Sequence, residues 1–178
     1  MSAVAPTVRL ERAFMAMLDD FDAHDPDNGA FYAPARQDFA AYVQQLLDEE
    51  AGRHLREGFV PCTHRWLVTD TEQLAGVTRL RHHINTPFLA ENGGHIGYDV
   101  APSHRRRGWG HFALATALKD ARQIGLTRVL LYAAEDNTAS RAIIVRAGGE
   151  LESIRYSEFW EENLCKYWVP IEASTVRV

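Results

Sequence analysis

Apolar positions in the first part of the chain follow a helical spacing, and from His64 onward they follow the spacing of strands. In the first part, apolar residues recur three or four positions apart, which is typical of one buried helix face. The two sets are Phe14, Met17, Leu18 and Phe21, followed by Phe39, Val43, Leu46 and Leu47. We expect a short strand at residues 7–10, a helix before the turn-forming segment 25–29, and a helix over about residues 36–55.

Beyond this point, short apolar and β-branched runs bounded by turn residues predict strands. The expected strands cover residues 65–69, 74–84, 95–100, 128–134, 150–159 and 164–171, with helices at 110–124 and 138–147. The first two strands would form an antiparallel hairpin. The run 128–134 is almost continuously apolar, as in a central strand buried on both faces, and can pair parallel to 95–100.

Size and charge limit the class of protein. The 178 residues suit one domain over 1–178, and no repeat or low-complexity linker divides them. The net charge of −5 argues against general nucleic-acid binding, which requires a basic face. The dense basic run is confined to Arg105, Arg106 and Arg107, so any anion that binds there should bind locally.

Cysteine usage and the first residues point to a reducing compartment. Cys62 and Cys165 are too few for a disulfide framework and lie in no metal or redox spacing. Residues 1–10 lack the apolar segment of a signal peptide, and no apolar run is long enough for a membrane span. Adjacent His82 and His83 would point to opposite faces of a strand, so we expect no metal. We therefore expect a cytoplasmic protein without membrane association.

The most informative stretch joins strand 95–100 to helix 110–124 through a basic turn with two glycines. The first amides of a helix lack intrahelical acceptors, and the helix dipole adds partial positive charge there. Gly108 and Gly110 permit close approach of a ligand, and the preceding arginines add full charges. We expect this turn to bind a pyrophosphate better than a single carboxylate.

Two common phosphate loops do not match this turn, because it has neither the third glycine of the dinucleotide fingerprint nor the Gly-Lys-Ser/Thr of the ATP loop. The spacing Arg105-x-x-Gly108-x-Gly110 resembles the acyl-CoA signature of the GNAT N-acetyltransferase superfamily. Two flanking blocks strengthen the resemblance, residues 96–103 before it and 135–149 after it. The resemblance covers about residues 66–168. Within the superfamily, the chain is similar to an uncharacterised bacterial subgroup of predicted acetyltransferases.

This resemblance implies an α/β (α+β) fold of the GNAT acyl-CoA N-acyltransferase type. Its mixed, mostly antiparallel sheet would have about seven strands, flanked by about four helices. The central parallel pair, 95–100 and 128–134, would be splayed for CoA. Residues 1–58 would form a variable helical region on the acceptor side, and 94–149 the acyl-CoA-binding core.

The resemblance also implies acetyl-CoA (coenzyme A) as the cofactor. The backbone amides of Arg106, Arg107, Gly108, Trp109 and Gly110, beside the Arg105 charge, would hold its pyrophosphate. Val100 would pair with pantetheine and donate its N–H to the thioester carbonyl. Asn137 would contact pantetheine or a water, or else only cap a helix. Ser140 would bond the cofactor or satisfy an amide of the first helical turn.

Acyl transfer to an amine requires a base for the ammonium proton and an acid for the thiolate. Where many members of the superfamily have a tyrosine as the acid, this chain has Ile144, which cannot donate a proton. Tyr98 could act instead, since strand alternation places it on the same face as Val100, or it could simply pack beside the sheet. His95, His83 and Glu135 are candidate bases near strand ends, and each histidine could equally be a hydrogen-bonded surface or loop residue.

The acceptor site is less defined by the sequence. Arg79 and Arg81 share one face of a strand and could bind a carboxylate of the acceptor, or they could face solvent. Phe31, Tyr32 and the loop 86–92 are further candidates, because the corresponding segments border the acceptor pocket in this superfamily.

Three hypotheses follow. The first is an acetyl-CoA-dependent N-acetyltransferase in which a primary amine, of a small molecule or a peptide, attacks the thioester directly. The second, motivated by Ile144, is a non-catalytic acyl-CoA-binding regulatory or interaction module. The third is a nucleotide-binding protein that uses the same turn. Pairing of outer strands could also form a homodimer.

Overall fold

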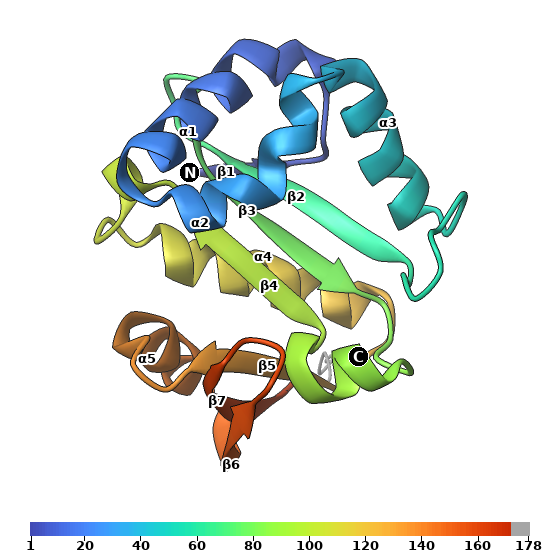
Figure 1. The fold of residues 1–178 in the computed structure, drawn as a ribbon, viewed down its shortest axis with the longest axis vertical. Helices are drawn as coiled ribbons and strands as arrows, with labels where there is room; N and C mark the ends of the chain where they lie inside the picture. Colours follow the sequence, from blue (N-terminus) through green and yellow to red (C-terminus); the bar gives the residue numbers. More distant parts are fainter. Residues whose placement is uncertain (172–178) are drawn as a thin grey trace, which may run out of the picture.

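The strands of the computed structural model, which describes residues 1–171, form two half-sheets (Figure 1). A four-stranded antiparallel sheet has the order β1-β2-β3-β4, and a three-stranded antiparallel sheet has the order β5-β7-β6. The strands are β1 (Ser2–Val4), β2 (Cys62–Val68), β3 (Leu74–Arg81), β4 (Ile96–Val100), β5 (Arg128–Ala134), β6 (Glu150–Ser157) and β7 (Glu162–Pro170). The expected sheet of about seven strands is therefore divided between β4 and β5.

The two half-sheets meet at one end of β4. His95 donates its backbone N–H to the Leu130 carbonyl over 2.7 Å, and the Leu130 N–H donates to His95 Nδ1 over 2.9 Å. Gly94 allows this close approach, because a Cβ at this position would lie 2.5 Å from the Leu130 oxygen. Beyond this junction β4 and β5 form no ladder, so the edges of both strands are open to a ligand.

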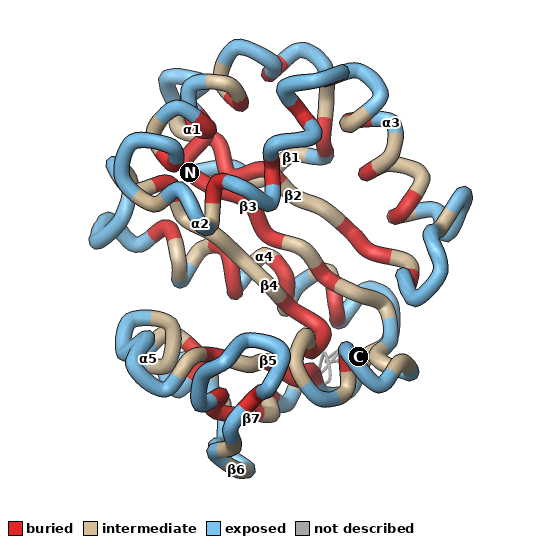
Figure 2. The backbone as a smooth tube through the Cα atoms, in the orientation of Figure 1, coloured by how far each residue is buried: buried red, intermediate tan, exposed pale blue. Residues whose placement is uncertain are grey.

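Helices cover both faces of the four-stranded sheet (Figure 1). On one face lie α1 (Glu11–His24), α2 (Pro26–Gly29), α3 (Phe39–Glu50) and the 3₁₀ helix Ala30–Arg36. The helix α4 (Trp109–Gln123) packs on the other face, and α5 (Thr138–Arg146) packs beside α4 and against β5 and β7. Buried residues follow the strands and the inward helix faces (Figure 2).

Three boundaries near the N-terminus differ from the sequence prediction. Residues 7–10 were expected as a strand, but Val8–Leu10 is a 3₁₀ turn in which the Thr7 hydroxyl accepts the Arg9 N–H, and the strand is Ser2–Val4 instead. The segment 25–29, expected as a loop, contains the single helical turn α2, since proline fits the first turn of a helix. The helix expected at 36–55 is the shorter α3, which begins at the Asp38 cap.

Two apolar clusters form most of the core. The first lies between the N-terminal helices and the four-stranded sheet, where the Phe14 ring is 4.8 Å from the Trp66 ring. The second joins Leu114 of α4 to Ile96 of β4 and to Leu131 of β5. Because one cluster contains residues of both half-sheets, α4 holds the two halves together across their line of separation.

Candidate active site

A cleft of about 640 Å³ opens where β4 and β5 separate. The N-terminal helical region, β3, the loop after β3 and the β6–β7 turn complete its walls. Seven residues expected at the site line it: Phe31, Tyr32, Arg79, Arg81, Tyr98, Asn137 and Ser140. The structure thus brings the predicted acceptor residues and two predicted cofactor residues into one cavity.

The glycine-containing turn at the start of α4 presents free amides. Within the described chain, the backbone N–H groups of residues 106–111 have no protein acceptor, whereas Arg105 and Phe112 on either side donate to Pro102 and Gly108. Gly108 adopts a φ of 85°, which turns the backbone into the helix. Six consecutive donors at the positive end of a helix can bind an anionic group such as a pyrophosphate.

The three arginines of this turn have different environments. Arg105 is paired with Asp25 and donates from Nε to the Val100 carbonyl over 3.1 Å, so it fastens the turn to the end of β4 and to the end of α1. Arg106 and Arg107 are exposed, and their side chains are in no ion pair within residues 1–171. The adjacent Trp109 is buried in the core, and only its backbone faces the turn.

Tyr98 extends from β4 toward α5. Its hydroxyl lies 2.8 Å from Ser140 Oγ, and burial raises its pKa although the Ser140 contact acts in the opposite sense. Asn137 Oδ1 accepts the Ser140 N–H over 2.9 Å, which makes Asn137 the cap of α5. The Asn137 side-chain amide nitrogen has no partner within the described residues, so it remains available to a ligand in the cleft.

The three residues considered as bases lie outside the lining of the cleft. His95 is 6% exposed and accepts the Leu130 N–H, and its burial, together with the charges of Arg81 and His83, lowers its pKa to about 4. His83 is exposed on the loop after β3. Glu135, also exposed, accepts a hydrogen bond from Asn163 over 2.9 Å.

A carboxylate that the sequence did not single out occupies the cleft instead. Asp99 Oδ2 accepts hydrogen bonds from Arg79 over 2.7 Å and from the Tyr32 hydroxyl over 2.5 Å. Arg79 also donates to the Tyr32 oxygen over 2.9 Å, which closes a three-membered network. Burial opposes the charged guanidinium, but Tyr32 and Asp99 raise the pKa of Arg79. Burial and the Asp99 carboxylate raise the pKa of Tyr32 well above its usual value.

The pairing of β3 with β4 explains this network. Arg79 faces Gly97 across the ladder, and a Cβ at residue 97 would lie 3.0 Å from Arg79 Nε. Asp99, two residues along, shares the face of Gly97 and therefore meets the same guanidinium. The sequence did contain a signal for this network, Gly97-x-Asp99 on one strand opposite an arginine on the neighbouring strand. To recognise it, one would have needed the register of β3 against β4.

A second missed pair lies nearby. His64 Nε2 is 2.8 Å from Glu49 Oε2, and both side chains are largely buried. Burial disfavours the imidazolium, but Cys62 and Glu49 outweigh it and raise the pKa of His64 to about 9. His64 lines the cleft beside the Arg79 network, and its partner Glu49 lies outside the lining.

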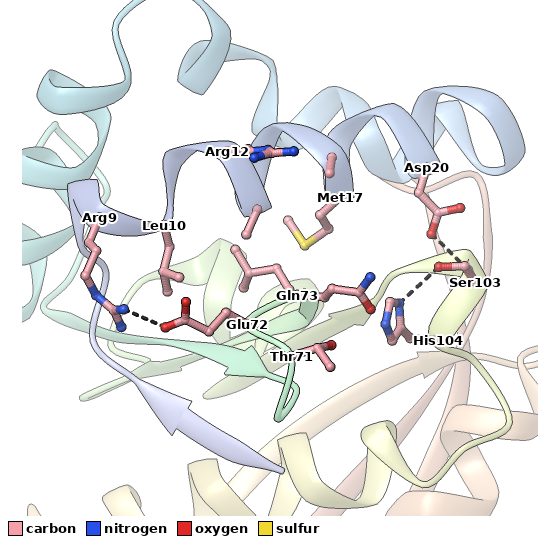
Figure 3. Close-up of a pocket in the computed structure, with 13 residues that line it drawn as sticks. Arg9, Leu10, Arg12, Met17, Asp20, Thr71, Glu72, Gln73, Ser103 and His104 are labelled. Carbon is pink, nitrogen blue, oxygen red and sulfur yellow. Dashed lines mark hydrogen bonds and ion pairs between the residues drawn. The ribbon is translucent and has the colours of Figure 1, made fainter.

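A separate pocket of about 580 Å³ lies between α1, the β2–β3 turn and the segment after β4 (Figure 3). Two of its charged groups are bonded within the pocket lining as an ion pair, and a third accepts a backbone amide. Arg9 pairs with Glu72 at 2.6 Å, and Asp20 accepts the Ser103 N–H at 2.9 Å. None of the predicted site residues lines this pocket.

Neither a metal site nor a membrane-spanning helix is present in the part of the chain that the structure describes. In residues 1–171, no three His, Cys, Asp or Glu side chains are grouped in a way that could hold a metal ion. Over the same residues, no helix combines the length and apolar character needed to cross a bilayer.

Two half-sheets that separate around a cleft, with free amides at the start of the adjacent helix, are the arrangement that the resemblance to acyl-CoA acyltransferases implies. The sequence matches the acetyltransferase (GNAT) family over residues 30–148, and the chain belongs to that family. No curated protein matches the sequence.

Solved structures share the fold at low sequence identity. RimL, a ribosomal alpha-N-protein acetyltransferase in complex with coenzyme A, has a TM-score of 0.70 and 17% identity, over 97% of this chain and 94% of that one. The microcin C7 self-immunity acetyltransferase MccE, in complex with acetyl-CoA and AMP, has a TM-score of 0.66 and 16% identity, over 95% and 91%. A chimera of spermidine N-acetyltransferase SpeG from Vibrio cholerae has a TM-score of 0.58 and 14% identity, over 96% of both chains.

Proposed function

We propose that this protein is an N-acetyltransferase that uses acetyl-CoA to acetylate a primary amine. The observation that supports it best is the placement of a proton donor, Tyr98, and a carboxylate, Asp99, at consecutive positions of the open strand β4. Neighbouring strand residues point to opposite faces, so the hydroxyl meets α5 and the carboxylate meets the acceptor side. Both line the same cleft, beside the turn that fits a pyrophosphate.

In this proposal, Tyr98 holds the proton that the leaving group requires. Its raised pKa keeps the hydroxyl protonated at neutral pH, and Ser140 orients the oxygen. This hydroxyl therefore replaces the tyrosine that many relatives have at the position of Ile144. Ile144 is fully buried here and contributes only to packing.

Asp99 is our proposed base. Both of its hydrogen bonds fall on Oδ2, and Oδ1 has no donor among the described residues, so Oδ1 is free to accept a proton from the acceptor amine. Arg79 and Tyr32 fix the orientation of the carboxylate. His83 and Glu135 remain hypotheses, but each would need a water to reach the cleft.

The direct route needs no enzyme nucleophile. Cys62 and Cys165 are both buried and lie outside the lining of the cleft. Acetyl-CoA supplies the activated acetyl group, and the chain binds, orients and exchanges protons. We propose that the amides of residues 106–111 hold the pyrophosphate and that the open edge of β4 near Val100, with the side-chain amide of Asn137, holds the pantetheine arm.

A non-catalytic acyl-CoA-binding module is the second candidate, and buried Ile144 is the observation that favours it. It predicts saturable acetyl-CoA binding without acetylation of any amine across a broad panel. The N-acetyltransferase predicts release of free thiol that depends on the amine.

The test begins with calorimetric titration of the protein with acetyl-CoA, and then measures thiol release with an amine panel. A Gly108→Glu variant, checked for folding, is the control, since its carboxylate would lie at the turn with the free amides. Gly110 is left unchanged because a Cβ there would lie 2.6 Å from Ile143 Cδ1. We expect binding to the wild type and none to the variant. Binding that survives in the variant would move the cofactor away from this turn, and tighter binding of ATP or NAD would favour a nucleotide-binding protein.

A further inference from the structure

The cleft is lined by four basic side chains, Arg56, His64, Arg79 and Arg81, and by two carboxylates, Asp99 and Glu162. His64 pairs with Glu49 at 2.8 Å and Arg79 pairs with Asp99 at 2.7 Å. Arg81 lines the same cavity and is in no ion pair within residues 1–171. A partly buried cation without a carboxylate is unfavourable, so its presence at a cleft indicates a charged ligand.

The Arg81 guanidinium is fixed in place before any ligand arrives. Nη1 donates to the Gly93 carbonyl over 3.0 Å and to the Gly94 carbonyl over 3.2 Å. Burial lowers the pKa of Arg81, and the nearby charge of Arg79 adds to this effect. The remaining guanidinium donors are free among the described residues. A guanidinium whose donors are bonded on one side and free on the other can bind a carboxylate or a phosphate.

Aromatic side chains from three segments gather at the mouth of the same cleft. Phe31 comes from the N-terminal 3₁₀ helix, Phe88 from the loop after β3, and Phe159 and Trp160 from the β6–β7 turn. Their rings contact one another: Phe88 is 4.8 Å from Phe159, Phe159 is 4.8 Å from Trp160, and Phe31 is 6.4 Å from Trp160. They are between 38% and 61% exposed, so their faces are open to a ligand.

Gly93 connects this aromatic cluster, Phe31, Phe88, Phe159 and Trp160, to the cation. Its carbonyl accepts the Arg81 hydrogen bond, and a Cβ at Gly93 would lie 3.3 Å from Phe88 Cε1. The guanidinium and the cluster are thus adjacent parts of one site. A ligand that meets both must have an anionic group and a flat apolar group close together.

We infer that the acceptor is a primary amine with an anionic group, which Arg81 binds, and an aromatic or apolar group, which packs on the aromatic cluster. This inference rests on the proposed function and names its substrate class. The anion can be a carboxylate or a phosphate, since both accept a bidentate hydrogen bond. A polyamine does not suit the Arg81 end of the cleft, because its ammonium groups would lie beside a guanidinium.

The test compares phenylalanine with phenylalaninamide, which lacks the carboxylate, with alanine, which lacks the ring, and with the polyamine spermidine. Thiol release from acetyl-CoA is the readout. For the wild type we expect the highest kcat/KM with phenylalanine, at least tenfold above spermidine. In Arg81→Met the KM for phenylalanine should rise about 10–100-fold, the range for loss of a charge-assisted hydrogen bond, while the KM for phenylalaninamide stays within about twofold. Arg81→Lys should retain part of the preference.

Two further variants test whether the aromatic cluster sets the acceptor preference and whether a substitution outside the cleft leaves that preference unchanged. Phe159→Ala should reduce the preference for phenylalanine over alanine several-fold, because the lost ring is exposed and its removal leaves the fold intact. Arg128→Met, at an exposed arginine stacked 4.1 Å from the Trp168 ring and outside the cleft, should leave every ratio unchanged.

The inference fails if spermidine is the preferred acceptor, or if Arg81→Met weakens the carboxylate and amide acceptors equally. If Arg81→Met does not fold, the wild-type preference for phenylalanine or for spermidine tests the inference. If no amine is acetylated although acetyl-CoA binds, the proposed function fails separately. Calorimetry of phenylalanine and spermidine with the coenzyme A complex then tests the site: tighter phenylalanine binding supports the inference, and absent or weaker binding overturns it.

Discussion

The Leu130 amide donates to His95 Nδ1 over 2.9 Å at the point where β4 and β5 separate. The imidazole nitrogen therefore accepts the hydrogen bond that Leu130 would donate to a backbone carbonyl in a continuous sheet. This contact ends the pairing of the half-sheets and begins the cleft. His95 therefore supports the wall of the cleft without lining it.

Replacement of His95 should lower stability. His95→Ala leaves the Leu130 N–H buried without an acceptor, which costs about 1–3 kcal/mol. His95→Asn supplies a carbonyl oxygen nearby and should cost less. Urea denaturation of the two variants measures the difference, and equal stability of His95→Ala and wild type would contradict this role.

The same histidine should make the fold sensitive to acid. Its pKa is lowered by burial from 6.5 to about 4, so between these values the unfolded chain binds a proton that the folded chain does not. Stability should fall as the pH drops from about 6.5 toward 4, by about 3 kcal/mol from this group. Comparison of denaturation at several pH values in the wild type and His95→Asn tests this. The variant should lack this part of the decrease in stability with falling pH.

His64 should produce the opposite dependence at higher pH. Cys62 and Glu49 raise its pKa from 6.5 to about 9 against the effect of burial, so the folded chain binds the extra proton. Its contribution is complete below pH 6.5 and is lost as the pH rises toward 9. In His64→Gln the thermal midpoint should be nearly independent of pH over this range, and an unchanged slope would exclude His64 as its origin.

Removal of the Tyr98 hydroxyl should slow turnover without loss of cofactor binding. Tyr98→Phe keeps the ring that packs beside α4 but removes the proton near Ser140. We expect kcat to fall by about 10²-fold. Ser140→Ala should have a smaller effect, because it only orients the oxygen, and acetyl-CoA affinity by calorimetry should be retained in Tyr98→Phe.

The role of Asp99 can be tested by an isosteric change. Asp99→Asn keeps the size of the side chain but removes the proton acceptor, so kcat should fall by about 10²–10⁴-fold at neutral pH. Glu135→Gln is the matched control at an exposed carboxylate outside the cleft and should retain activity. A large loss in Glu135→Gln with little loss in Asp99→Asn would reverse the assignment.

Local patterns in the sequence predicted most of the helices and strands. Phe14 and Phe21 lie on the buried face of α1, as their spacing predicts, and the apolar run of β5 is buried as expected. The N-terminal strand was misplaced because Thr7 can cap a turn as readily as it can occupy a strand. Local signals near such residues do not distinguish the two outcomes.

The site required information that is not local. His95 precedes β4, as a residue facing the cleft would, but its ring turns to a backbone amide of β5, thirty-five positions away. Asp99 was missed because its partners are Arg79 across the ladder and Tyr32 from a separate helix. The cofactor turn was visible because its function resides in consecutive residues.

The attachment of α4 to both half-sheets also limits how far the cleft can widen. One apolar cluster joins Leu80 of β3, Leu114 of α4 and Val129 of β5, so the two walls behind the open strand edges form a single packed body. The walls cannot move apart without exposing this apolar core to water, which is unfavourable. The gap between β4 and β5 is therefore a fixed feature of the folded chain, present before any ligand binds.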